Sequence, residues 1–100
     1  MADVRKLRRY SSTKSFELTA ASRGIAPGSA SALALVRALG RLRSAERLPL
    51  EGDALVEFWG SETCWAHRFT ESLWLYYKVV PNDPDEAIVL RAIHDYVHQQ

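Results

Sequence analysis

The sequence predicts an α+β fold in which an amphipathic helix packs on a four-stranded, mainly antiparallel sheet. Apolar side chains in residues 29–47 recur at the spacing of one helix face. The second half of the chain holds four short runs typical of β-strands. The breaks between these runs are too short for crossover helices, so each strand must turn back along its neighbour. The expected strands are residues 54–59, 63–70, 72–80 and 86–93.

Turn-forming residues separate the four expected strands. The breaks read Gly-Ser-Glu at 60–62, Thr-Glu-Ser at 70–72 and Pro-Asn-Asp-Pro-Asp at 81–85. The third run gives the clearest strand pattern, since apolar or aromatic side chains dominate both of its faces. We therefore expect it in the middle of the sheet.

The helix is bounded by recognisable signals. Ser29 or Ser31 can cap its N-terminus, and Pro49 ends it because Leu48 is pushed out of helical geometry. Gly40 costs the helix about 1 kcal/mol relative to alanine, so we expect a close contact or a kink there. The expected core stripe is Leu35, Val36, Leu39 and Leu42, with Arg37, Arg41, Ser44 and Arg47 on the opposite side.

The first 28 residues have a weaker pattern. Residues 16–19 fit a short strand, and residues 23–28 fit a loop because they hold two glycines and a proline. Residues 1–14 are basic, and both a short helix and a flexible or partner-ordered arm fit them. We expect a single domain over residues 1–100, with 1–14 as this basic arm.

Charge is distributed unevenly along the 100 residues. The net charge is only +1, but the first fifty residues hold ten of the 13 Lys and Arg and three of the 12 acidic residues. The two halves therefore carry net charges of +7 and −6. This asymmetry favours a basic surface that binds RNA or an acidic partner.

The cysteine count and the hydropathy pattern bear on the compartment. Cys64 is the single cysteine, so no internal disulfide can form, which suits a reducing cytoplasm. No apolar run approaches the ~20 residues of a membrane span, and no apolar signal core follows the basic N-terminus. We expect a cytoplasmic protein with no membrane partner.

Ionisable side chains cluster where the last expected strand ends. His94 is suited to proton transfer near neutral pH, and Asp95 or Tyr96 can orient it or take part. Arg91 can bind a phosphate. A structural role at the sheet edge also fits these residues. His94 and His98 lack a third ligand at a recognised spacing, so we predict no metal site and no cofactor.

Other candidate residues lie on the helix and the middle strands. His67 and Arg68 are neighbours on one strand and should face opposite sides of the sheet, so they cannot share a site without a bulge. Trp74 and Tyr76 are the aromatic residues we expect to be exposed, where they can stack on bases. Arg37 and Arg41 fit either a solvated helix face or contacts to phosphate groups.

The order of a basic segment, an amphipathic helix and a strand-turn-strand meander resembles the RelE/ParE-type toxins of bacterial toxin–antitoxin modules. Residues 65–79 and 87–94 carry the resemblance, which covers about half of the chain. Leu75-Tyr76-Tyr77-Lys78 matches the family's apolar-apolar-Tyr-basic run. Val89-Leu90-Arg91-Ala92-Ile93-His94 matches its last strand, which ends near a His or Arg. Residues 48–52 look like the family's linker into the sheet.

The resemblance implies a small α+β toxin that inhibits translation by cleaving mRNA on the ribosome and is neutralised by a cognate antitoxin. The sequence leaves open whether the chain is a metal-independent endoribonuclease. The alternative is a non-catalytic interaction protein of similar fold, such as a ParE-like poison of DNA gyrase or an inhibitor that occludes a partner. If the cleavage chemistry is present, the resemblance implies that His94 and Tyr96 handle protons, while Arg68, Lys78 and Arg91 hold phosphate.

Overall fold

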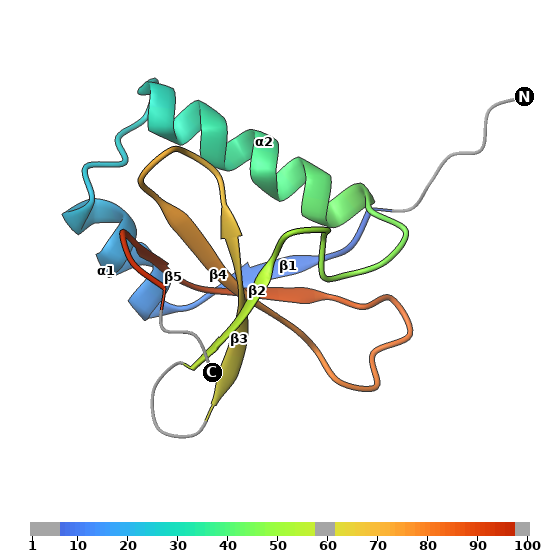
Figure 1. The fold of residues 1–100 in the computed structure, drawn as a ribbon. Helices are drawn as coiled ribbons and strands as arrows, with labels where there is room; N and C mark the ends of the chain where they lie inside the picture. Colours follow the sequence, from blue (N-terminus) through green and yellow to red (C-terminus); the bar gives the residue numbers. More distant parts are fainter. Residues whose placement is uncertain (1–6, 58–61, 98–100) are drawn as a thin grey trace, which may run out of the picture.

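Two helices and a five-stranded mixed sheet make up the structure, a computed structural model that describes residues 7–57 and 62–97. Figure 1 shows the long helix lying across a strongly twisted sheet, with the short helix beside it. No helix within these described ranges is long and apolar enough to cross a membrane. In chain order the elements are β1 (Tyr10–Ser12), α1 (Lys14–Ser22), α2 (Ala30–Ser44), β2 (Ala54–Glu57), β3 (Thr63–Arg68), β4 (Trp74–Val79) and β5 (Ile88–His94).

The strand order across the sheet is β1-β5-β4-β3-β2. Strands β2 to β5 form the antiparallel meander that the short breaks predict, and β4 is the central strand, as expected. We expected four strands, but the sheet has a fifth, β1, which pairs in parallel with β5. Three residues without alternating hydrophobicity carry too little signal to be recognised as a strand before their partner is known.

The strand expected at residues 16–19 is wrong, because these residues lie inside α1. Thr13 starts this helix, and its hydroxyl accepts a hydrogen bond from the Phe16 backbone N–H at 3.1 Å. Phe16 and Ala20, four residues apart, pack together against the core. The helical spacing of these two residues outweighs the strand-like run between them.

Helix α2 begins where the sequence predicts, with the Ser29 hydroxyl accepting from the Ala32 N–H at 3.1 Å. The expected core stripe is correct for Leu42, which is buried, but wrong for Val36, which is 65% exposed. The buried face instead passes through Ala38. The close contact expected at Gly40 is also wrong, since a Cβ there would meet no atom within 4 Å.

The sheet separates two groups of buried side chains. On the helix side, Leu75, Tyr77 and Ile93 pack with residues of α1 and α2. On the opposite side, Cys64, Ala66, Tyr76 and Ala92 form a smaller cluster against which Trp74 and Val97 pack. Burial raises the pKa of the Cys64 thiol to about 11. We call these two sides the helix side and the open side.

Arg8 joins the N-terminal segment to the end of α2. Its guanidinium donates to the carbonyl oxygens of Leu42 at 3.0 Å and Glu46 at 3.3 Å, and also to that of Ala45. It also pairs with the Glu86 carboxylate at 3.1 Å, and the residue is only 6% exposed. A cation at this position satisfies carbonyl groups that the helix end leaves without partners.

We predict that Arg8→Ala lowers the free energy of unfolding by about 3 kcal/mol, because one buried and two part-buried carbonyl groups lose a charged donor. Arg9→Ala is the matched control, since Arg9 is exposed and pairs with Asp83 at the surface. Its expected cost is below about 1 kcal/mol. Urea unfolding of the three proteins measures both values, and equal costs would contradict the assigned role of Arg8.

Candidate functional site

Three of the residues singled out in the sequence form one row across the open side of the sheet. Arg68 of β3 lies opposite Trp74 of β4, and Trp74 lies opposite His94 of β5. Directly paired residues of antiparallel strands project from the same face. The pairing therefore brings together a cation, an indole and an imidazole from three different strands.

Ring contacts and carbonyl groups hold this row in place. The Arg68 guanidinium lies 5.9 Å from the centroid of the Trp74 ring, and its Nε donates to the carbonyl oxygens of Thr70 at 3.2 Å and Glu71 at 3.1 Å. The turn after β3 thus fixes the Arg68 side chain while the residue stays exposed.

Tyr96 extends the row beyond the end of β5. Its ring centroid lies 4.7 Å from that of His94, which also meets the edge of the Tyr76 ring at 4.8 Å. The Tyr76 hydroxyl donates to the Tyr96 carbonyl oxygen at 2.9 Å, and Arg23, which follows α1, pairs with Asp95 at 3.3 Å. These bonds hold residues 95–96 against the sheet, with Tyr96 exposed. We call Arg68, Trp74, His94 and Tyr96 the open-side row.

Arg91 and Lys78 share one acidic partner. Arg91 Nη2 lies 2.9 Å from Glu62 Oε2, and Lys78 Nζ lies 3.4 Å from Glu62 Oε1. Arg91 sits at the irregularity between β4 and β5, where the register shifts at Tyr76 and Tyr77. Together the three side chains carry a net charge of +1, so Glu62 weakens the positive field on the open side.

The expected exposure of Tyr76 is wrong, since this residue is 1% exposed. Its neighbours on the adjacent strands are Ala66 and Ala92. These small side chains leave room for the Tyr76 ring in the buried cluster on the open side of the sheet. Trp74, the other aromatic residue expected at the surface, is half-buried.

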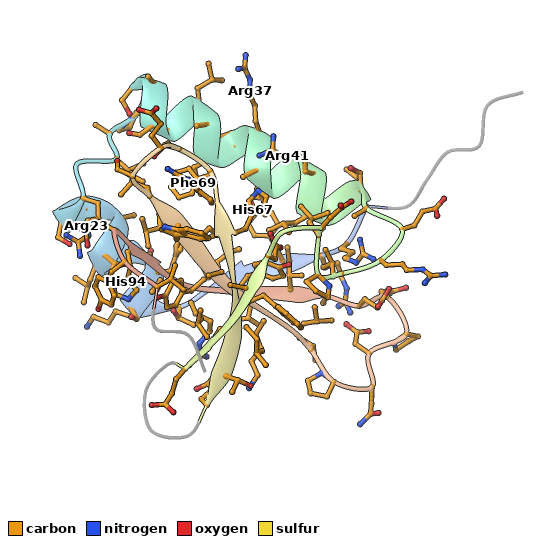
Figure 2. The ribbon with its side chains drawn as sticks, in the orientation of Figure 1. Arg23, Arg37, Arg41, His67, Phe69 and His94 are labelled. Atoms are coloured by element: carbon orange, nitrogen blue, oxygen red, sulfur yellow. The ribbon has the colours of Figure 1, made fainter. Side chains whose placement is uncertain are left out.

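The sheet keeps Arg37 and Arg41 away from the open-side row. Both arginines are exposed on α2, which covers the helix side. Figure 2 shows Arg41 close to His67 and Arg37 projecting away from the sheet, with His94 apart from both and near Arg23. His67 lies opposite the helix-side residue Leu75, whereas Arg68 lies opposite Trp74. The expectation that His67 and Arg68 face opposite sides is therefore confirmed.

A second polar cluster on the helix side centres on Asp53, which the sequence did not single out. Asp53 Oδ1 lies 2.7 Å from His67 Nδ1, and Asp53 Oδ2 accepts from the Tyr77 hydroxyl at 2.5 Å and the Leu50 N–H at 3.2 Å. The Asp53 side chain is 2% exposed and that of His67 is 12% exposed. The nearest sequence signal is a polar residue following the turn glycine Gly52, which is too common to identify a site.

Arg41 completes the second cluster from α2. Its Nη2 lies 3.3 Å from Nε2 of His67. A guanidinium can only donate, so His67 accepts at Nε2 and must carry its proton on Nδ1, where it donates to Asp53. We call Asp53, His67, Tyr77 and Arg41 the Asp53–His67 cluster.

Burial and the Asp53 carboxylate act together on Tyr77. Burial of the hydroxyl has the largest effect and raises the pKa of Tyr77 well above its usual value. The hydrogen bond to Asp53 and the negative charge of its carboxylate raise this pKa further. Tyr77 therefore stays a neutral hydrogen-bond donor throughout the physiological range.

No group of three His, Cys, Asp or Glu side chains within residues 7–57 and 62–97 is placed to hold a metal ion. His98, one of the two histidines considered as a metal pair, lies outside the described residues. No protein-family model, curated protein or solved structure gave a significant match to this chain. Its function is therefore inferred from the geometry of the open-side row and from the resemblance in the sequence.

The raised pKa of Tyr77 predicts a loss of stability at alkaline pH. Above the usual tyrosine pKa of about 10 the unfolded chain releases this proton while the folded chain keeps it, so stability falls by up to about 1.4 kcal/mol per pH unit. Tyr77→Phe should remove this part of the slope, whereas the exposed Tyr10→Phe should keep it. Urea unfolding between pH 8 and 11 measures the slopes, and equal slopes for wild type and Tyr77→Phe would count against the Tyr77–Asp53 bond.

Proposed function

We propose that the chain is a RelE/ParE-like toxin that inhibits translation in the cytoplasm by cleaving ribosome-bound mRNA, and that a cognate antitoxin protein neutralises it. The α+β architecture, with helices followed by an antiparallel meander, supports this proposal because the resemblance rests on that order. What the architecture shares with the resemblance is the α+β fold class.

The open-side row is the observation that carries the proposal. Metal-independent RNA cleavage needs proton transfer at the 2′-hydroxyl and at the leaving oxygen, together with positive charge on the phosphate. His94 and Tyr96, 4.7 Å apart between ring centroids, are the groups that exchange protons. Arg68, held by the carbonyl groups of the turn after β3, supplies the charge.

Aromatic surfaces beside these groups suit a single-stranded substrate. Trp74 lies between Arg68 and His94 in the row, and Tyr96 is exposed at its end. Unpaired bases stack on such rings, with a contribution of about 1–3 kcal/mol per base. Bases held there would leave their phosphates close to Arg68, with Arg91 and Lys78 farther along the same side.

The pairing of Arg91 and Lys78 with Glu62 favours a second candidate function. A nuclease gains from cations that meet the substrate, whereas these two already share a carboxylate. A non-catalytic protein of similar fold has no such requirement. This candidate is a ParE-like poison of DNA gyrase or an inhibitor that occludes a partner.

Tightly induced expression in a bacterial host tests the proposal. We expect rapid arrest of bulk protein synthesis and new mRNA ends at ribosome-bound sites. His94→Ala should lower the rate of cleavage by about 100-fold or more, the usual contribution of a general acid or base. Co-expression of a protein from a neighbouring short reading frame should restore growth if that protein is the antitoxin.

Tyrosine variants supply the matched control for this experiment. Tyr96→Phe keeps the ring beside His94 and removes the hydroxyl, so cleavage should fall, while Tyr10→Phe makes the same change on β1 and should leave cleavage unchanged. Unfolding curves establish that each variant is folded. Normal translation under wild-type expression would refute an autonomous toxin. Arrest without new mRNA ends would favour the non-catalytic candidate.

A further inference from the structure

The Asp53–His67 cluster lies on the helix side of the sheet and takes no part in the proposed chemistry of the open-side row. Its members come from α2, from the residue before β2, and from β3 and β4, so chain segments distant in sequence converge on one histidine. The cluster therefore calls for an explanation of its own.

Asp53 fixes the imidazole of His67 in one orientation. The carboxylate is nearly fully buried and accepts from the Leu50 N–H, the Tyr77 hydroxyl and His67 Nδ1. These three donors hold the carboxylate and thereby the ring, with Nε2 turned toward Arg41. The hydrogen bond from Nδ1 to Asp53 leaves the lone pair of Nε2 facing Arg41.

Arg41 is exposed, and the contact to His67 Nε2 uses a single one of its five N–H donors. Within the described ranges, no other hydrogen bond is recorded for this guanidinium. Arg37 lies four residues earlier, so it occupies the same side of α2 one turn away. Figure 2 shows Arg41 close to His67, whereas Arg37 projects from α2 away from it. The rim of the cluster thus carries one cation, Arg41, beside a ring nitrogen of a histidine that Asp53 holds in place.

We propose that Arg41 and His67 form a binding site for a phosphate group, with Asp53 as the residue that positions His67. A phosphate accepts from Arg41 through one oxygen and, once solvent supplies a proton to Nε2, from His67 through another. The two nitrogen atoms lie 3.3 Å apart, a spacing that adjacent oxygens of one phosphate can bridge.

The phosphate belongs either to a small phosphorylated molecule or to the backbone of single-stranded RNA. Both present the same oxygens to Arg41 and His67, so inorganic phosphate serves as the first probe. A short oligouridine without terminal phosphate groups serves as the second, because its phosphates are diesters alone. Comparison of the two identifies the source of the ligand.

Imidazole nitrogen resonances of the full-length chain, recorded in long-range ¹H–¹⁵N spectra, give the direct readout. Sodium phosphate is added against sodium chloride at matched ionic strength and constant pH. We expect a saturable shift of His67 Nε2 toward its protonated position. Arg41→Gln should weaken phosphate binding at least tenfold, whereas Arg47→Gln, the same change at an exposed arginine beyond the end of α2, should alter it less than twofold.

Either ligand source is compatible with the site. If the shift of His67 saturates at a lower concentration of oligouridine than of inorganic phosphate, the ligand is RNA backbone. If only inorganic phosphate gives a saturable shift, the ligand is a small phosphorylated molecule. No saturable shift of His67 with either probe, or unchanged affinity in Arg41→Gln, would overturn the proposal. Because Arg41 is exposed, this variant should stay folded. The readout does not depend on RNA cleavage, so it separates this site from the proposed toxin activity.

Discussion

The buried Asp53 carboxylate organises the junction between α2 and the sheet. It ties the linker at Leu50, strand β3 at His67 and the central strand β4 at Tyr77. A buried charge is tolerated only when hydrogen bonds replace the water it has lost, and three donors do so here. The same contacts fix the ring of His67 and keep Tyr77 protonated, so one carboxylate links the fold to the chemistry on the helix side.

The sheet divides the polar residues of this small domain into two separate sites. Alternation along β3 sends His67 toward α2 and Arg68 to the open side, although the two residues are adjacent. Arg68, Trp74 and His94 then form a row because the antiparallel pairing places them opposite one another. The proposed RNA cleavage belongs to this row, and the proposed phosphate binding belongs to the opposite side. The same register therefore positions both sites.

Local patterns predicted the α+β class, the central strand and the start of α2, because turn residues, period-two alternation and an N-cap act over a few residues. Pairing between distant segments was not predictable in this way. The parallel β1, the buried Tyr76 between Ala66 and Ala92, and the role of Asp53 all depend on residues far away in the sequence. Val36 was misplaced because the apolar face of α2 is centred near Ala38, and alanine gives little hydrophobic signal.

The tautomer of His67 tests the account most directly, because the proposed role of Asp53 requires the proton on Nδ1 and a lone pair on Nε2 facing Arg41. Long-range ¹H–¹⁵N spectra of the free protein at pH 8, where histidine is mostly neutral, distinguish the two ring nitrogens. The account predicts a protonated Nδ1 and an unprotonated Nε2 in the wild type. A wild-type His67 with its proton on Nε2 would contradict it.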